Sequence, residues 1–504
     1  MAELFSSRGS QRLLFGGAVG AMVIVRFVVY SSGGAPPTVD AGNWLAFGDS
    51  LLGDGIRDSS ISYPPTVPLL TKAAVAMFGL TVGVSLLAAI ATAAPAVGLF
   101  HTLGAFGIGR LRLVPTLLLL CVGSVSEAAA WGGFPQLLAM GVLPVGVLLG
   151  HRLVVGPSRR TAVSFGLALM ASFAISHFVS AILVLAVALL VIHHLIRAWS
   201  VGWVTAMAKH AIWVLLPLVW LIPIYWNLID AILLNPNEFG DLDNVTFSNL
   251  FNRLEHIYSD APILWRLMVP LTVVTPWLSW RNRASAQMYV FSSLYFATGL
   301  LLVVTRESRY LYLLPMLAML ASSVWLAETE SRYEGATSKL SARQVRLVVA
   351  FVVIVLFGQA FGGIRQLDNQ RDFYAVMRPP LIDAIEAADD LAGPDEVIAV
   401  PSVRGAPIGW WVEALSNNQV LYGSPLRWLN FADEVDRASR ANAIFQADFP
   451  NSESLELLRE ADVSVVLVPR TWTWFDHDRV LTWAATNDIE VELINGDAVV
   501  LSVG

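Results

Sequence analysis

Apolar runs recur along the first three quarters of this 504-residue chain, and most of them are close in length to a membrane-spanning helix. An α-helix needs about 20 residues to cross the hydrocarbon core of a bilayer. Hydrophobic residues make up 56% of the sequence and charged residues 14%, a balance that excludes a soluble globular protein. We therefore predict a multi-pass α-helical membrane protein.

Eleven of these runs are predicted to be transmembrane helices, namely residues 13–30, 80–103, 113–126, 134–150, 162–176, 177–196, 210–229, 263–280, 287–304, 310–326 and 347–363. Residues 63–79 are left out, because their prolines and Lys72 favour a short amphipathic or re-entrant helix on the outer surface. The first run follows Arg8 and Arg12 and is interrupted only by Arg26. No convincing cleavage site follows it, so we expect an uncleaved signal anchor.

Basic residues support this topology, because loops that stay in the cytoplasm are enriched in lysine and arginine. With eleven spans the N-terminus is cytoplasmic, and the arginine-rich loops face the cytoplasm as well. The basic residues on that side are Arg110, Arg112, Arg152, Arg159, Arg160, Arg197, Arg281, Arg283, Arg332, Lys339, Arg343 and Arg346. Counting residues 63–79 as a further span would reverse every later loop and break this agreement. We therefore predict a plasma-membrane protein whose C-terminal part is extracytoplasmic.

The C-terminal part has a different composition. Residues 364–504 contain 23 Asp and Glu, 10 Arg and no Lys, although the net charge of the whole chain is only −7. Strand-like runs occupy residues 396–400, 463–469, 489–494 and 498–503, and helical patterns occupy residues 383–392, 432–445 and 452–461. We expect a transmembrane domain at residues 1–363, with its first outer loop at 31–79, then a polar linker at 368–380 within an extracytoplasmic α/β domain at 364–504.

The predicted topology gathers polar residues at the outer ends of the spans. They are Asp40, Asp49, Asp54 and Asp58 in the first outer loop, Glu127, Trp131, His177, residues 234–262 and the segment from Arg306 to Tyr310. Ionisable groups at span ends are costly unless they are paired, hydrated or functional, so their convergence indicates a site. Taken singly, each has a bland alternative: a hydrated loop acid, a hydrogen-bonded bundle histidine or a snorkelling arginine.

Several short motifs occur in a recognisable order. An acid follows the first span, and Tyr63-Pro64-Pro65, WGGFPQLL from Trp131, Ser176-His177 and R-x-x-R-Y-x-x-x-L-P from Arg306 come after it. Over roughly residues 10–330 this order resembles the C-type (GT-C fold) integral-membrane glycosyltransferases. These include protein mannosyltransferases, lipid A aminoarabinose transferases and oligosaccharyltransferases. The strength of the resemblance lies in the order and topology of the motifs, since none of them is diagnostic alone.

The resemblance implies a hexosyl- or pentosyltransferase that takes a sugar from a polyprenyl-phosphate or polyprenyl-pyrophosphate donor and inverts its anomeric centre. Asp40 then matches the general base, and Asp49 and Asp58 are further candidates for this catalytic role. Arg306, Arg309 and Lys72 are candidates for holding the donor phosphate. Candidate substrate-binding residues are Tyr63, Glu127, Trp131, His177, Tyr310, Trp410, Trp411 and Glu413. The acceptor would be an extracytoplasmic glycan, lipid or protein.

The chain departs from the family pattern at two points. Ala41 follows Asp40 where many members have Glu, and the first outer loop has no D-x-D or D-x-E motif. The sequence therefore specifies no cofactor and leaves a divalent metal open. The only cysteine, Cys121, allows neither an intramolecular disulfide nor a cysteine metal cluster.

Two alternatives stay open. Trp410, Trp411 and Glu413 suit sugar stacking and hydroxyl recognition, or the aromatic rings pack the domain core or dock it on the membrane part. At the level of function, the alternative is a transporter or a non-catalytic assembly protein with a glycan- or partner-binding outer domain. Transporters usually show internal repeats and polar residues near the midplane, whereas the ionisable residues here cluster at span ends. Nothing in the sequence indicates a nucleic-acid partner.

Overall fold

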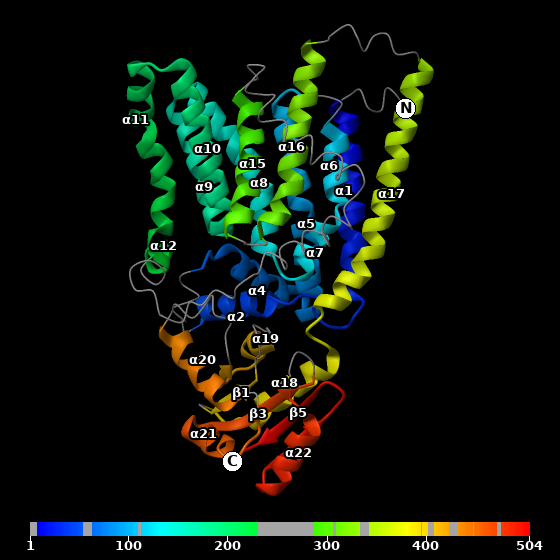
Figure 1. Cartoon of the computed structure of the whole chain (residues 1–504), viewed down its shortest axis with the longest axis vertical. Helices are drawn as coiled ribbons and strands as arrows, with labels where there is room; N and C mark the ends of the chain where they lie inside the picture. The colour runs from blue at the N-terminus through cyan, green and yellow to red at the C-terminus, as the bar shows by residue number, and fades with distance from the viewer. Residues whose placement is uncertain are drawn as a thin grey trace.

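A computed structural model describes most of the chain. The described residues are 8–53, 63–108, 112–229, 286–305, 309–332, 342–394, 396–401, 408–422, 432–446, 448–470 and 475–503. The molecule has three layers along its long axis: a bundle of long helices, a pair of shorter helices lying across one end of the bundle, and a small domain with a β-sheet (Figure 1).

Each predicted transmembrane run within the described residues is helical. The bundle elements are α1 (Arg8–Ser31), α5 (Leu80–Ala105), α6 (Leu113–Leu120), α7 (Gly123–Ala130), α8 (Phe134–Val155), α9 (Arg159–Ile175), α10 (His177–Ala198), α11 (Val201–Leu215), η2 (Leu216–Leu221), α12 (Ile222–Ile229), α15 (Ala286–Thr305), α16 (Arg309–Arg332) and α17 (Ala342–Tyr374). Of the helices described, five are long and apolar enough to cross a membrane, and α6 with α7 forms a sixth if the pair is one span bent by 40°. The predicted span at 263–280 lies outside the described residues. The prediction of a multi-pass helical membrane protein is confirmed.

The bundle packs through small residues. Helices α5 and α8 cross at Gly98 and Gly141, where a side chain on Gly98 would collide with the carbonyl of Gly141. Close backbone approach of this kind is typical of membrane helices, because lipid supplies no hydrophobic force to drive them together. Helix α5 also contains Pro95, and α8 contains Pro144. Proline inside a membrane helix is tolerated where neighbouring helices satisfy the backbone groups that it leaves without a partner.

Helices α2 (Ala41–Leu52) and α4 (Thr66–Phe78) form the middle layer and lie across the end of the bundle (Figure 1). Residues 41–48 of α2 are buried, because α4 packs against the helix on one side and α19 (Ile408–Leu415) of the C-terminal domain on another. The two helices touch at Gly48, where a Cβ atom would come within 2.6 Å of the Pro68 carbonyl oxygen. The prediction that residues 63–79 do not form a full span is confirmed, since α4 is a short helix of 13 residues.

The C-terminal domain has a five-stranded sheet in the order β2-β1-β3-β5-β4. Its strands are β1 (Val397–Val400), β2 (Gln419–Tyr422), β3 (Val463–Pro469), β4 (Glu490–Ile494) and β5 (Ala498–Ser502). Strand β1 pairs in parallel with β2 and with β3. Strand β5 pairs antiparallel with β3 on one side and with β4 on the other. Its helices are α18 (Pro379–Leu391), α19 (Ile408–Leu415), α20 (Ala432–Ile444), α21 (Ser454–Glu460) and α22 (His477–Thr486). The predicted α/β class and the four predicted strands are confirmed, whereas β2, α19 and α22 were not expected.

Both faces of this sheet are buried, by different partners. Ile398, Val465 and Val500 belong to the core that continues into the membrane part through α18 and α19. The alternate residues of the same strands, such as Ala399 and Val466, pack under α20, α21 and α22. Because successive side chains of a strand point to opposite faces, one sheet joins the two cores.

The junction between the domains differs from the expected one. Helix α17 continues without a break to Tyr374, so the predicted boundary between residues 363 and 364 falls inside a helix. The polar residues from 368 onward extend this helix beyond its apolar part, and the linker begins at Ala375. The start of α1 lies at the end of the bundle opposite the C-terminal domain (Figure 1).

Candidate functional site

Asp40 lies directly before α2 and is fixed through its backbone. Its N–H donates to the carbonyl oxygen of Trp131 at 3.0 Å, and Trp44 Nε1 donates to the carbonyl oxygen of Gly132 at 2.7 Å. Gly132 has a φ of +97°, and a Cβ atom there would come within 2.8 Å of the Cβ of Asp40. The turn between α7 and α8 therefore holds the start of α2 at two points and needs glycine to do so.

Tyr63 connects this turn to the bundle. It is 6% exposed, and its ring packs on Trp44 at 4.9 Å and edge to face on His177 at 5.8 Å between ring centres. Burial raises the pKa of Tyr63 well above its usual value, while the charge of Arg309 lowers it and that of Asp40 raises it further. Tyr63 is thus a neutral hydroxyl group that lies within electrostatic reach of both a cation and an acid.

Arg309 is the first residue of α16 and belongs to the same group. Its backbone carbonyl accepts a hydrogen bond from Gln136 Nε2 at 2.7 Å, which ties the start of α16 to the start of α8. Arg309 is close enough to His177 to interact with it electrostatically. The ring of the next residue, Tyr310, packs at a tilt against Phe178 with ring centres 4.6 Å apart, so the first turns of α8, α10 and α16 meet around Arg309.

Several helices begin at this place. Helix α4 starts just after Tyr63, and α8, α10 and α16 start near Gln136, His177 and Arg309. A helix N-terminus carries partial positive charge on unpaired N–H groups, which favours a bound anion. No side chain caps the first turn of α4 or α8, whereas Ser176 accepts a hydrogen bond at the start of α10.

Three buried polar atoms in this group have no hydrogen-bond partner among the described residues. They are Trp131 Nε1, Gln136 Oε1 and His177 Nδ1. An unsatisfied buried polar atom costs about 1–3 kcal/mol, so native structures usually pair such atoms with water or a ligand. Gln136 is 3% exposed and was not among the predicted site residues. The available signal was its place in WGGFPQLL, as a polar side chain at the start of an apolar helix.

Lys72 and Asp49 occupy a different environment from Asp40. They form an ion pair between α4 and α2, and about a third of each side chain is exposed. A paired cation is less available to a phosphate, and the described contacts join neither residue to Tyr63 or Arg309. Asp54, Asp58 and Arg306 lie outside the described residues.

Glu127 lies at the seam between α7 and α17. Its Oε1 accepts a hydrogen bond from the hydroxyl of Tyr374 at 3.0 Å, one turn away from the Gln370 side chain that binds the Gly123 carbonyl at 3.2 Å. These bonds hold α7 against α17, so Glu127 has a structural role. It lies four residues before Trp131, which begins the turn after α7.

The C-terminal aromatic residues dock the domain. Trp411 is fully buried, and its ring covers Gly42 of α2 so closely that a Cβ atom there would lie 2.7 Å from it. Trp410 is also buried, and Glu413 accepts hydrogen bonds from Tyr422 at 2.6 Å and Arg437 at 2.8 Å. The structure therefore favours the packing alternative for these residues, because neither ring presents a face to a sugar.

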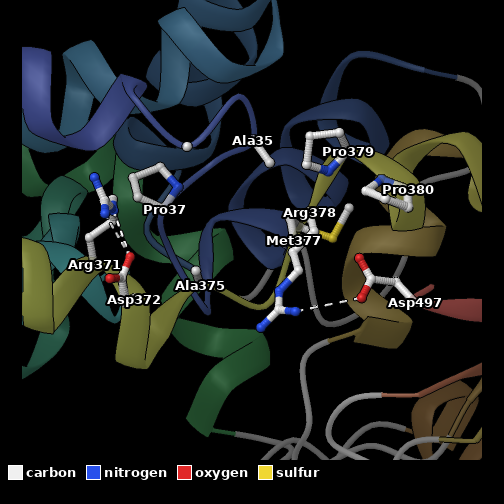
Figure 2. Close-up of a pocket in the computed structure, with 11 residues that line it drawn as sticks. Ala35, Pro37, Arg371, Asp372, Ala375, Met377, Arg378, Pro379, Pro380 and Asp497 are labelled. Carbon is white, nitrogen blue, oxygen red and sulfur yellow. Dashed lines mark hydrogen bonds and ion pairs between the residues drawn. The ribbon is translucent and has the colours of Figure 1, made fainter.

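A pocket of about 470 Å³ opens where α1, α17 and the C-terminal domain meet (Figure 2). Its charged residues form two pairs: Arg371 with Asp372 at 2.8 Å and Arg378 with Asp497 at 3.6 Å. Pro37 lines it, three residues before Asp40, but Asp40, Tyr63, His177 and Arg309 do not. Within the described residues no three His, Cys, Asp or Glu side chains are grouped as metal ligands.

Comparison with known proteins gives a match in structure alone. No protein-family model and no curated protein sequence matches the chain. The chain is similar to the crystal structure of ArnT from Cupriavidus metallidurans in the apo state, with a TM-score of 0.59 and 14% identity over 98% of this chain and 97% of that chain. It is also similar to the same protein bound to undecaprenyl phosphate, with a TM-score of 0.61 and 16% identity over 99% of both chains. The likeness covers both domains, and the expected GT-C fold is confirmed.

Proposed function

We propose that this protein is a membrane glycosyltransferase that moves a sugar from a polyprenyl-phosphate donor to an extracytoplasmic acceptor. The observation that carries the proposal is the grouping of Asp40, Tyr63, His177 and Arg309 at one end of the bundle. An acid, a cation and several helix N-termini grouped in this way suit a lipid-linked phosphate, whose charged head group lies at a membrane interface.

The chemistry follows from the two charges. Asp40 removes the proton of the acceptor hydroxyl group as its oxygen attacks the anomeric carbon of the sugar. The bond from that carbon to the phosphate oxygen breaks, and its electron pair leaves with the polyprenyl phosphate. Arg309 stabilises the negative charge on the departing phosphate, helped by the N-termini of α8 and α16. A single displacement of this kind inverts the anomeric centre.

The unpaired atoms around Arg309 give the donor sugar its contacts. Trp131 Nε1 donates, Gln136 Oε1 accepts, and His177 Nδ1 does either according to its tautomer. Sugar hydroxyl groups both donate and accept, so they satisfy such a mixed set without any further charge. Tyr63 adds a neutral hydroxyl group between the acid and the cation.

The carrier lipid is supported by the comparison. One similar structure is ArnT bound to undecaprenyl phosphate, and it matches this chain over nearly its full length. We infer that a polyprenyl phosphate is the carrier here as well. The basic residues at the opposite end of the bundle, among them Arg152, Arg159 and Arg197, favour a site on the extracytoplasmic side of the plasma membrane.

The proposal is tested with purified full-length protein, radiolabelled sugars linked to undecaprenyl phosphate, and a membrane extract as the source of acceptors. We expect release of undecaprenyl phosphate together with label in a glycan, lipid or protein fraction. The matched negative control is the Asp40→Asn variant. Binding of undecaprenyl phosphate without turnover of any labelled donor would favour the non-catalytic assembly protein, and transport of label across liposomes would favour the transporter.

A further inference from the structure

The first transmembrane helix carries a buried arginine. Arg26 lies in the last two turns of α1, and only 1% of its surface is exposed. In the described part of the chain no carboxylate pairs with it. A guanidinium group within a membrane span is costly to bury, so such residues are generally retained for a function. Burial inside the bundle excludes the usual alternative, in which the side chain reaches out to the membrane surface.

The partners of Arg26 lie on two other helices. Its Nη1 donates to the hydroxyl of Thr92 in α5 at 2.9 Å, and its Nη2 donates to the carbonyl oxygen of Leu120 at 2.6 Å. Leu120 is the last residue of α6, where the span formed by α6 and α7 breaks and bends by 40°. The last carbonyl groups of a helix have no partner within the helix, and in a membrane water cannot supply one. A cation at this end also complements the helix dipole.

The same helix holds the other side of the break. Tyr30 lies one turn beyond Arg26, and its hydroxyl donates to the carbonyl oxygen of Ser126 in α7 at 3.1 Å. Helix α1 therefore fixes the end of α6 through Arg26 and the middle of α7 through Tyr30. Helix α17 holds α7 from another side through Gln370, which binds the carbonyl of Gly123.

These contacts lead to Asp40. Helix α7 ends at Ala130, and the next two residues, Trp131 and Gly132, supply the carbonyl oxygens that hold Asp40 and Trp44. A rotation of α7 about the break would move both carbonyl oxygens, and with them the start of α2. The direction of α7 thus sets the position of the proposed base.

We propose that Arg26 is a positioning residue for the transfer reaction: it fixes the break between α6 and α7 and, through the turn at Trp131, the place of Asp40. The inference rests on the proposed function for its kinetic consequence but not for its structural one. Arg26 touches no substrate in this scheme, and it acts only through the backbone of α7.

The test compares Arg26→Gln and Arg26→Lys with Arg12→Gln, a change of an exposed arginine in the same helix. Arg26→Gln should lower kcat by about 10- to 100-fold, the loss expected when a reacting group is misplaced by about 1 Å. The affinity for undecaprenyl phosphate, which lacks the sugar, should stay unchanged, because Arg309 is not moved. Arg26→Lys should recover part of kcat, and Arg12→Gln should leave kcat unaltered.

A second measurement needs no activity. Hydrogen exchange of the peptide that covers residues 38–48 should accelerate in Arg26→Gln and not in Arg12→Gln, because its hydrogen bonds to the turn loosen. Unchanged exchange in this peptide would overturn the inference, whether or not the wild-type protein is active. An inactive wild-type protein with accelerated exchange in Arg26→Gln would instead reject the proposed function alone.

The double variant Arg26→Gln/Asp40→Asn separates positioning from general loosening. If Arg26 acts through Asp40, adding Arg26→Gln to Asp40→Asn should cause little further loss of kcat. Full multiplication of the two effects would show that Arg26 acts elsewhere and would overturn the inference.

Discussion

The backbone N–H of Asp40 donates to the carbonyl oxygen of Trp131 at 3.0 Å, so a residue of the first outer loop is held by the turn that precedes α8. The two residues are far apart in the sequence and come from different layers of the molecule. Their contact holds the proposed base at the end of the bundle on which α2 lies. The contact depends on Gly132, the residue after Trp131.

Replacing Gly132 should separate Asp40 from the turn at Trp131. In Gly132→Ala the new Cβ atom would lie 2.8 Å from the Cβ of Asp40, and alanine would have to adopt a φ of +97°. We expect a stability loss of about 1–3 kcal/mol and a fall in transfer of about 10- to 100-fold. The control is Gly202→Ala, where a Cβ atom would meet nothing within 4 Å. Equal transfer rates in both variants would show that Asp40 need not be held by this turn.

Arg309 should account for much of the affinity for the donor phosphate. Arg309→Ala should weaken binding of undecaprenyl phosphate by about 1.5–3 kcal/mol, the value of a hydrogen bond to a charged group. Arg309→Lys should rescue binding only in part, because lysine lacks the planar fork of donors. The matched control is Arg378→Ala, which removes an arginine from the separate pocket at the same end of the bundle. A loss confined to Arg378→Ala would move the phosphate site to that pocket.

The transmembrane part could be predicted because its signal is local. Apolar runs, prolines and arginine placement are read from short windows, and they gave the helices of the bundle and the short helix at residues 66–78. The four predicted strands were found for the same reason, since a short run rich in β-branched residues, such as 463–469, is recognised without knowing its distant partners. The boundary at residue 363 was wrong because α17 continues into water as a polar helix, and polarity alone does not end a helix.

The site could be predicted only as a set of candidates. The sequence placed Asp40, His177 and Arg309 at one end of the bundle, but it could not decide which acids and bases pair. Asp49 and Lys72 pair with each other, and Trp411 is buried under Gly42; both outcomes depend on how α2 packs between two domains. Arg26 was visible only as an interruption of an apolar run, since its partner Leu120 lies on a helix 94 residues further along.

Asp389 should make the C-terminal domain sensitive to acid. Burial raises the pKa of this carboxyl group, but hydrogen bonds from Ser416, Asn417 and Asn418 outweigh it and leave the pKa below its usual value. The folded state therefore binds this proton less readily than the unfolded state, so the stabilisation is complete above a pH of about 4 and is lost as the pH falls. Thermal unfolding of the full-length protein in detergent should show a smaller acid-induced drop in Tm for Asp389→Asn than for wild type. Asp390→Asn, at an exposed neighbour, should behave like wild type.

The orientation in the membrane can be tested with single cysteines in a Cys121→Ala background. Ala485→Cys lies in the C-terminal domain and Gly202→Cys near the start of α11, and both positions are exposed. An impermeant thiol reagent should label position 485 in intact cells and position 202 only after lysis, because the arginine-rich end faces the cytoplasm. Labelling of position 202 in intact cells would invert the topology and place the Asp40 group inside.

Asp40→Asn is the substitution on which the mechanism depends. Asparagine keeps the size of the side chain and leaves the backbone bond to Trp131 in place, but it cannot take a proton from the acceptor. Transfer should fall by about 10²- to 10⁴-fold, the usual contribution of a general base, while binding of undecaprenyl phosphate persists because Arg309 is intact.

The comparison with the other acids decides the assignment. Asp49→Asn removes a partner of Lys72 at a partly exposed ion pair, which is worth about 0–1 kcal/mol, so turnover should change little. Near-normal turnover in Asp40→Asn together with collapse in Asp58→Asn would move the base along the first outer loop and leave the fold unaffected. Normal turnover in all three variants would reject proton abstraction by a carboxylate of this loop, because no acid would then be required for attack by the acceptor.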